Sequence, residues 1–263
     1  MSNPPPAVLA FAASDPTGGA GIQADLLTLA RLGCHPLSVV TGLTVQDTRG
    51  VQALWPVEAG RVAQQAECVL ADIAVAAFKL GVLGTADVVG AVAGILDAHP
   101  AIPVVLDPVL ASGRGDALSD AGTLQALRDL LLPRVTVLTP NSMEARRLAG
   151  ASPDAPLDEC ADRLVAMGCA HVLVTGTHEP GVDVCNTLYS ARGRVREDRW
   201  PRLPAEYHGS GCTLASAVAA GLSHGLDVEE AVQRAQAFTW KALEAAFRPG
   251  GGQYLPQRFF AQP

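Results

Sequence analysis

At 263 residues, with 49% hydrophobic and 17% charged residues, the chain is long enough to bury the core of a large α/β domain. Its formal net charge of −7 argues against a nucleic-acid partner, so a phosphate-bearing ligand must be held by local donors. The sequence has no apolar run of membrane length and no signal-peptide pattern in residues 1–6. Its six cysteines are scattered and show neither C-x-x-C nor zinc spacing. We therefore expect a cytoplasmic protein without a membrane partner.

Short apolar runs and helical patterns alternate along the first half of the chain. Strands are predicted at 7–13, 37–43, 76–80 and 103–106. Helices are predicted at 22–32, 57–71 and 85–97, the first ended by Gly33 and the third capped by Thr85. A turn-rich stretch at 14–21 and a polar loop at 44–50 lie between them, and Asp107 directly follows the fourth strand.

The second half continues this alternation after a glycine-bearing loop at 111–116. A helix capped by Ser119 and ending near 132 is followed by a strand at 135–138, a polar turn at 139–144 that opens a helix, a helix at 158–167 and a strand at 171–174. Residues 185–190 and 195–200 are predicted to form an antiparallel hairpin. Helices at 212–224 and 228–247 complete the pattern.

This order predicts a mostly parallel central sheet with helices on both faces and a small antiparallel hairpin at one edge. The sequence has no repeat and no linker long enough to separate domains, so we expect one domain over residues 7–263 after a disordered segment at 1–6. Ligands of such sheets bind beyond the carboxyl ends of the strands. The polar turns named above all fall at that edge.

The stretch 207–216 (YHGSGCTLAS) indicates an anion site. Gly209, Ser210 and Gly211 precede a run of small, helix-compatible residues, so several backbone N–H groups are expected to point together from the positive end of a helix. Cys212 lies on the first turn and offers an ionisable side chain beside the site. Such a pairing suits a transferring group on which charge develops. The alternative is an ordinary helix capped by Ser210.

The first glycine-rich turn has two interpretations. Residues 19–24 match the short dinucleotide pattern G-x-G-x-x-A between a strand and a helix, which makes an NAD-dependent oxidoreductase a distant alternative. That interpretation leaves the turn around Ser210 unexplained. Alternatively, the glycines let the backbone close around a small substrate, and Asp25 bonds its polar groups. Asp25 is also an ordinary acid near the start of a helix.

Asn141 and Glu144 lie three residues apart at a strand-to-helix turn and therefore share one face. With Asp107 at the end of a neighbouring strand, they offer oxygen ligands of the kind that Mg²⁺ prefers. An asparagine turn followed by a glutamate at the helix start is the structural alternative.

Several catalytic classes lack their motifs. The sequence has no P-loop, no protein-kinase catalytic loop and no G-x-S-x-G elbow. A cysteine hydrolase that pairs Cys212 with His208 stays conceivable, although no third group that would orient the histidine is evident.

Six stretches in order resemble one family. They are 14–25 (SDPTGGAGIQAD), 46–50 (QDTRG), 79–83 (KLGVL), 105–109 (VLDPV), 139–144 (TPNSME) and 208–213 (HGSGCT). Over nearly the whole chain, the sequence resembles the hydroxymethylpyrimidine/phosphomethylpyrimidine kinases of thiamine biosynthesis (ThiD family), which have a three-layer α/β/α ribokinase-like fold.

The resemblance implies phosphorylation of 4-amino-5-hydroxymethyl-2-methylpyrimidine and its monophosphate by ATP with Mg²⁺, in a homodimer. Pyridoxal kinases on the same scaffold are the alternative. The roles it implies fall on these positions: pyrimidine contacts from Asp25, Gln46, Ala13, Gly21, Val82 and Val109; an anion hole at Gly209–Cys212; ATP contacts from Asn141, Thr175 and Thr177; and metal contacts from Glu144 and Asp107.

Two features of this site differ from related kinases. Better-known members have K-G-G-H where this chain has T-G-T-H at 175–178, so a phosphate-facing lysine is absent, and Arg114 is a candidate replacement. Cys212 stands where many sugar kinases of this fold place an aspartate. The ordinary pKa of a thiol is about 8.5 and a helix N-terminus is expected to lower it, whereas an adjacent phosphate would raise it. Whether the thiol is a base stays open at this point.

Overall fold

The computed structural model describes residues 4–110 and 119–260. Its strands are β1 (Ala7–Ser14), β2 (His35–Asp47), β3 (Gly50–Pro56), β4 (Val75–Leu80), β5 (Val104–Leu106), β6 (Val137–Leu138), β7 (His171–Thr175), β8 (Asp183–Ser190) and β9 (Gly193–Pro201). Within the described residues they form one sheet in the order β3-β2-β1-β4-β5-β6-β7-β8-β9. Six neighbouring strands, β2, β1, β4, β5, β6 and β7, run parallel to one another. Strands β3, β8 and β9 are added at the two edges by antiparallel pairing.

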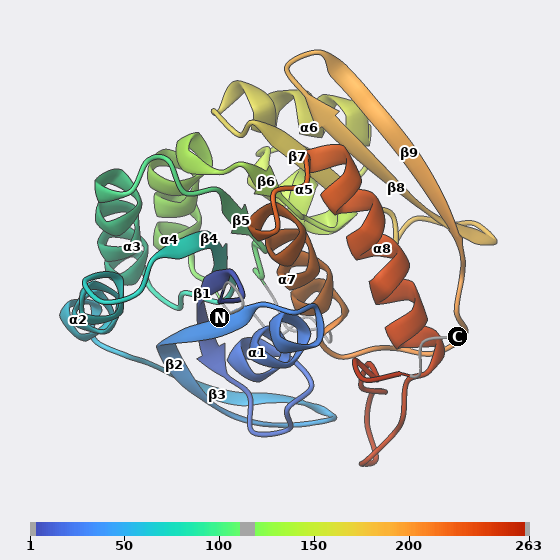
Figure 1. Ribbon diagram of the computed structural model, residues 1–263. Helices are drawn as coiled ribbons and strands as arrows, with labels where there is room; N and C mark the ends of the chain where they lie inside the picture. Colours follow the sequence, from blue (N-terminus) through green and yellow to red (C-terminus); the bar gives the residue numbers. More distant parts are fainter. Residues whose placement is uncertain (1–3, 111–118, 261–263) are drawn as a thin grey trace.

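Helices cover both faces of this sheet (Figure 1). They are α1 (Gly21–Arg31), α2 (Ala59–Leu70), α3 (Ala86–Ala98), α4 (Ala121–Ala126), α5 (Ser142–Leu148), α6 (Leu157–Ala166), α7 (Ser210–Ser223) and α8 (Val228–Glu244). The alternation of β1 sorts its side chains between the two layers, since successive residues of a strand point to opposite faces. Leu9 and Phe11 pack with α2 to α6, whereas Val8 and Ala10 pack with α1, α7 and α8.

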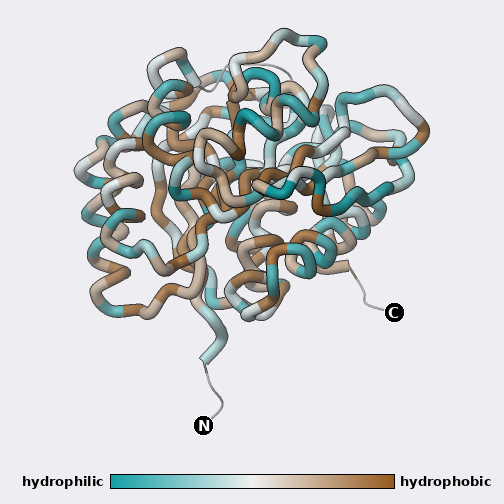
Figure 2. Tube along the Cα trace, turned by 90° about the horizontal axis from the view of Figure 1, so that it is seen from above, coloured by the Kyte–Doolittle hydropathy of each residue, from teal (hydrophilic) through white to brown (hydrophobic). Residues whose placement is uncertain are grey.

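The predicted three-layer α/β/α fold with a mostly parallel sheet is therefore confirmed, as is the β8–β9 edge hairpin. Figure 2 shows hydrophobic residues along the central strands and more hydrophilic stretches on the surrounding loops. The core between the sheet and helix α7 is rich in alanine, which allows this helix to lie close to the sheet.

The prediction of a polar loop at 44–50 was wrong. Residues 44–47 continue β2, and β3 returns antiparallel along it, with Leu43 opposite Trp55. The hairpin lies at the sheet edge, where polar and apolar residues alternate with only partial burial. An edge hairpin of this kind has neither the continuous apolar run of a buried strand nor a glycine-rich turn that would have identified it.

Two helix ends also differ from prediction. Asp120, not Ser119, caps α4 by accepting a bond from the backbone N–H of Thr123. The helix then continues as a π-helical turn over Leu127–Leu131 and a 3₁₀ turn over Leu132–Arg134. At the other end of the chain, α8 stops at Glu244, because Phe247 pairs with Leu255 in an antiparallel bridge.

The terminal segment predicted to be disordered falls partly outside the described residues, which begin at Pro4. The carbonyl of Pro6 already accepts a bond from the N–H of His35, at the start of β2. No described helix is both long and apolar enough to cross a membrane.

Candidate active site

Polar and glycine-bearing turns, including those of the predicted residues Asp107 and Asn141, gather at the carboxyl ends of the parallel strands. Asp15 follows β1, Gly81 follows β4, Asp107 follows β5 and Asn141 follows β6. Helix α7 packs against β1, β4 and β5. This edge is where doubly wound sheets bind ligands.

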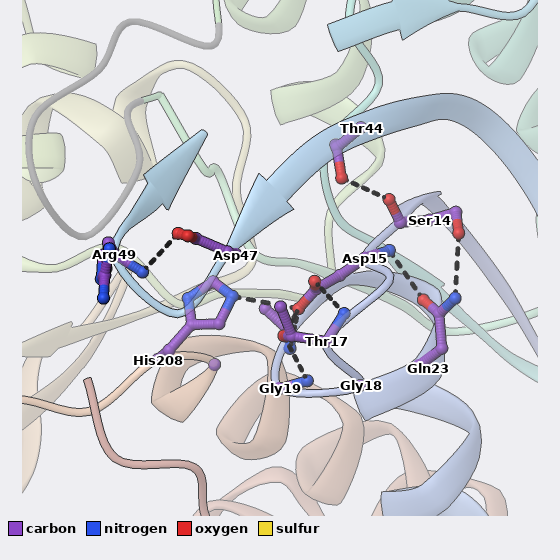
Figure 3. A network of polar contacts seen from close by, with 12 residues as sticks. Ser14, Asp15, Thr17, Gly18, Gly19, Gln23, Thr44, Asp47, Arg49 and His208 are labelled. Carbon is purple, nitrogen blue, oxygen red and sulfur yellow. Dashed lines mark hydrogen bonds and ion pairs between the residues drawn. The ribbon is translucent and has the colours of Figure 1, made fainter. Parts of the chain in front are cut away.

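Asp15 fixes the first glycine-rich turn, a role that the sequence analysis missed (Figure 3). Its carboxylate accepts bonds from the N–H groups of Thr17 at 2.8 Å and Ala20 at 2.7 Å, and His208 Nε2 lies 3.0 Å from it. Although burial opposes ionisation, the bonds from His208, Ala20 and Thr17 hold the pKa of Asp15 below its usual range. One ionised carboxylate thereby joins this turn to the stretch before α7.

The N-terminus of helix α7 has the geometry expected of an anion site. Gly209, with φ of +84°, is its N-cap residue, and no side chain among the described residues caps the first turn. Within residues 4–110 and 119–260, the N–H groups of Ser210, Gly211 and Cys212 keep the unpaired state that helix geometry gives them. A Cβ at position 209 would lie 1.9 Å from the carbonyl oxygen of Gly19. The two glycine turns are thus in direct backbone contact, and the alternative in which Ser210 caps the helix is wrong.

Asp25 is held in a buried ion pair. Its Oδ1 lies 2.8 Å from Nζ of Lys79 and accepts a bond from Ser216 of α7, also at 2.8 Å. Neither charged side chain has any exposed surface. Asp25 does not line an open pocket in this structure, so its predicted contact with a pyrimidine stays a prediction. Sequence reasoning missed Lys79 as a partner, although it is one of only two lysines.

Cys212 lies in the same buried cluster, and its predicted pKa shift was wrong in direction. Burial raises the pKa of the thiol to about 12; Lys79 opposes this shift, while Asp107 and Asp25 add to it. A Cβ at Gly211 would lie 3.4 Å from both oxygens of Asp107, which places that carboxylate against the first turn of α7. At neutral pH the thiol is therefore protonated and is a hydrogen-bond donor, with the carboxylate of Asp107 as its acceptor in this structure.

Asn141 and Glu144 form a capping box at the start of α5. Asn141 Oδ1 accepts from the N–H of Glu144 at 2.9 Å, and Glu144 Oε2 accepts from the N–H of Asn141 at 3.0 Å. Glu144 Oε1 also accepts from the N–H of Leu110 at 3.4 Å. The structural alternative for these two residues is thus realised, and any ligand contact would come in addition to it.

Asp107 and Glu144 repel each other across the site. Burial raises the pKa of Asp107 to about 6, with Lys79 opposing and Asp25 adding to the shift. Burial and the charge of Asp107 raise the pKa of Glu144 to about 8. The described residues hold no group of three or more His, Cys, Asp or Glu side chains arranged for a metal ion. A cation here would be shared between these two carboxylates and other oxygens.

Other predicted residues surround this centre. Ala13 and Gly21 touch through the backbone, since a Cβ at Gly21 would lie 2.4 Å from the carbonyl oxygen of Ala13. The carbonyl of Val82 accepts from Thr41 Oγ1, and the N–H of Val109 donates to the carbonyl of Asp107.

The remaining predicted residues lie farther along the sheet edge. Gln46 stands on β2 opposite Val51, and Thr175 bridges to Asn141 in parallel. Thr177 is exposed, with its carbonyl held by Arg202 at 2.7 Å. Arg114 lies outside the described residues.

The geometry weakens both unrelated interpretations. A dinucleotide needs open space beside Gly19, but Leu255 and His208 fill it, at 2.5 and 2.8 Å from where a Cβ would stand. For a hydrolase, Asp15 does orient His208, contrary to expectation. The high pKa of the Cys212 thiol nevertheless argues against a nucleophile prepared as a thiolate.

The fold and this edge define a phosphotransferase of the ribokinase-like class, with a capless helix N-terminus as its anion site. The family model described as phosphomethylpyrimidine kinase matches residues 15–257, and the chain belongs to that family. A hydroxymethylpyrimidine/phosphomethylpyrimidine kinase of Streptomyces coelicolor is 42% identical over 94% of this chain and 92% of its own length. The Escherichia coli protein of the same name is 37% identical over 90% and 91%.

Solved structures agree on the fold. An ADP complex of Bacillus subtilis pyridoxal kinase matches with a TM-score of 0.88 and 29% identity, covering 96% of this chain and 97% of the other. Phosphomethylpyrimidine kinase from Clostridium difficile 630 matches with a TM-score of 0.79 and 29% identity, covering 90% and 99%. The predicted family and kinase class are therefore confirmed.

Proposed function

We propose that this protein transfers the γ-phosphoryl group of ATP to the hydroxymethyl group of 4-amino-5-hydroxymethyl-2-methylpyrimidine and then phosphorylates the resulting monophosphate, as a step of thiamine biosynthesis. The observation that carries the proposal is the family match over residues 15–257, which includes both glycine turns of the site. Curated relatives at 37–42% identity bear names with both activities.

The anion site supplies what phosphoryl transfer asks of a protein. Charge spreads over the oxygens of the transferring group, and catalysis consists mainly of positioning and electrostatic stabilisation. The unpaired N–H groups at 210–212 offer fixed donors without a mobile side chain. Cys212, protonated and beside them, donates a hydrogen bond to the reacting oxygens rather than removing a proton from the hydroxymethyl group.

Mg²⁺ fits the acidic side of the site. Asp107 Oδ2 is buried without a hydrogen-bond partner in the described structure, and its carboxylate raises the pKa of Glu144. A divalent cation would remove that repulsion, and its own chemistry would be to neutralise charge on the phosphates of ATP. We therefore assign Glu144 and Asp107 to metal binding, with Asn141 and Glu144 fixed by their reciprocal cap.

On the nucleotide side, the proposal assigns Asn141, Thr175, Thr177 and Arg114 to ATP. Thr175 and Asn141 support this assignment because they bridge at the ends of neighbouring strands. We also propose a homodimer, for which the outer strand β9 offers an edge. Light scattering of the purified protein measures the mass in solution and tests that part alone.

Pyridoxal is a second candidate substrate. The structures of pyridoxal kinases from Bacillus subtilis and Staphylococcus aureus match with TM-scores of 0.87–0.88, above the 0.79 of the Clostridium difficile phosphomethylpyrimidine kinase. Both aromatic substrates carry a hydroxymethyl group, so one site chemistry serves either. The sequence identities to those pyridoxal kinases, 27–29%, are lower than the 37–42% to the curated pyrimidine kinases.

The test is ADP formation by the purified protein with ATP and Mg²⁺, measured separately with hydroxymethylpyrimidine, its monophosphate and pyridoxal. We expect turnover with both pyrimidines and a kcat/KM for pyridoxal at least about tenfold lower, which corresponds to about 1.4 kcal/mol of discrimination. Absence of turnover with either pyrimidine, in protein that still unfolds cooperatively, contradicts the proposal.

A further inference from the structure

The segment that follows α8, residues 245–260, crosses the candidate site. The N–H of Gln253 donates to the carbonyl of Thr48, at the turn of the β2–β3 hairpin. Tyr254 pairs with Tyr207, just before the anion turn, and Leu255 packs against Gly19. The C-terminal segment therefore contacts three loops that are far apart in the sequence.

Arg258 is a buried cation on this segment. Its side chain is buried, with only 4% of the residue exposed. The guanidinium donates to the carbonyl of Gly19 at 2.6 Å, the carbonyl of Gly18 at 3.4 Å and Oγ1 of Thr213 at 3.2 Å. Thr213 Oγ1 in turn donates to the carbonyl of Gly209 at 2.8 Å. One side chain thus joins the first glycine turn to the N-terminal turn of α7.

The burial of this cation is unusual because no described carboxylate is paired with it directly, and Asp25 and Asp15 act on it only through space. Within the described residues, all three partners of Arg258 are uncharged oxygens, and none of the ion pairs includes it. Burying an unpaired charge is costly. Burial lowers the pKa of Arg258, opposed by Cys212, Asp25 and Asp15. Stability alone would favour an apolar side chain here, so the cation is better explained by the anion site that it adjoins.

We propose that Arg258 is a positioning residue of the phosphoryl-transfer site. It holds the carbonyls of Gly18 and Gly19 against the first turn of α7, so that the N–H groups at 210–212 and the thiol of Cys212 keep one arrangement. Its charge adds to the positive potential that those N–H groups present to a phosphate. The inference rests on the proposed function for its catalytic meaning, but its structural part is measurable without turnover.

The matched control is Arg248, on the same segment. It also donates to two glycine carbonyls, those of Gly251 and Gly252, and its guanidinium lies over the ring of Tyr254, but it is exposed and bonds neither α7 nor the first glycine turn among the described residues. The variants are Arg258→Met, Arg258→Lys and Arg248→Ala. Thr213→Val, which keeps the volume and removes one acceptor, serves if Arg258→Met fails to fold.

The readout is the rate of iodoacetamide alkylation at each cysteine, followed by mass spectrometry of peptides. Cys160 and Cys169 are internal references, since both are buried in the other helical layer. We expect Arg258→Met to raise the rate at Cys212 at least tenfold with both references unchanged, and to lower kcat at least tenfold. Arg258→Lys should show smaller changes than Arg258→Met in both the alkylation rate at Cys212 and kcat. Arg248→Ala should behave as wild type.

Two results would overturn the inference. One is a rate at Cys212 that stays at the wild-type value in Arg258→Met or, if that variant does not fold, in Thr213→Val. The other is a parallel rise at Cys160 and Cys169, which identifies a general loss of stability. If Arg258→Met exposes Cys212 selectively but the wild-type protein has no kinase activity, the positioning role is supported and only the proposed function is contradicted.

Discussion

The two halves of the sheet edge are built in different ways. On the side of β1, β4, β5 and α7, charged groups with no exposed surface meet, as in the pair of Asp25 and Lys79. On the side of β6 and β7, the predicted residues are held by local backbone bonds, as in the capping box of Asn141 and Glu144. The first half depends on buried charged side chains from distant segments, whereas in the second the capping box joins two residues three positions apart.

This difference has a functional consequence under the proposed chemistry. The reacting end of a phosphoryl acceptor needs fixed donors in a site that excludes water, where electrostatic interactions are strongest. A nucleotide needs a rim that admits and releases a large ligand. The buried half meets the first need and the locally capped half the second, so substitutions in the two halves should differ in kind and size.

The largest expected effect breaks the buried ion pair. Lys79→Met leaves the carboxylate of Asp25 unpaired and should cost about 3–5 kcal/mol in the free energy of unfolding. In the other half, Arg146→Met breaks a pair of 2.7 Å with Glu179 whose side chains are 15% and 34% exposed, and should cost about 1 kcal/mol. Urea unfolding of both variants measures the contrast, and equal costs would remove the distinction.

Turnover measurements on variants of Cys212 and Thr177 compare the buried half of the site with its exposed rim. Cys212→Ala should lower kcat about 100-fold and leave the KM for the pyrimidine nearly unchanged, because a donor that acts on the transition state is lost. Cys212→Ser, which keeps a donor, should retain more activity than Cys212→Ala. Thr177→Ala, on the exposed rim, should change the KM for ATP by less than about threefold. Near-normal kcat in Cys212→Ala would exclude the thiol from the mechanism.

Glu144 lies between the two halves, and its raised pKa makes the stability of the protein depend on pH. A carboxyl group whose pKa is raised from 4.5 to about 8 in the folded state binds a proton there that the unfolded chain has released. Stability therefore falls as the pH rises from about 4.5 to 8, and Glu144→Gln should lack this fall. Because Glu144 is only half-buried, we expect a difference of about 1–2 kcal/mol rather than the full shift.

Mg²⁺ provides the matching measurement. By favouring the ionised carboxylates, it should raise the melting temperature of the wild type at pH 8 and leave that of Glu144→Gln and Asp107→Asn almost unchanged. Removal of Mg²⁺ with a chelator should reverse the gain. An equal gain in all three proteins would place the cation elsewhere.

The smallest expected effect concerns a cap. Asn141→Ala should cost about 1 kcal/mol, the usual contribution of an N-cap side chain, and should also raise the KM for ATP. The matched control is Asp227, which caps α8 through the N–H of Glu230 at 2.8 Å. Asp227→Ala should cost as much stability without changing the KM. An unchanged KM in both variants would leave Asn141 a purely structural residue.

The sequence was sufficient wherever a pattern is local. The alternation of strands and helices predicted the three layers, and the G-S-G turn predicted the start of α7. It was insufficient where distant segments meet. Three contacts of this kind join residues 54 to 240 positions apart, and no periodicity in the sequence predicts them. They are the ion pair of Asp25 with Lys79, the bond between Asp15 and His208, and the bonds from Arg258 to the first glycine turn.

The direction of the Cys212 shift shows the same limit. A helix N-terminus lowers a thiol pKa when the thiol meets solvent, but here burial, with Asp107 and Asp25, raises the pKa of Cys212 despite the opposing charge of Lys79. Burial is a property of the assembled fold. The position of the thiol could be predicted from its motif, whereas its protonation state could not.

The central claim, that the first-turn N–H groups of α7 stabilise the transferring phosphoryl group, is tested most directly by Gly209→Ala. Its Cβ would collide with the carbonyl of Gly19 and displace that turn. Gly225→Ala is the control, since Gly225 has a similar φ of +83° and open space around it. We predict that, with hydroxymethylpyrimidine and ATP, kcat falls at least about 100-fold in Gly209→Ala and less than threefold in Gly225→Ala. Equal activity of the two variants would contradict the account.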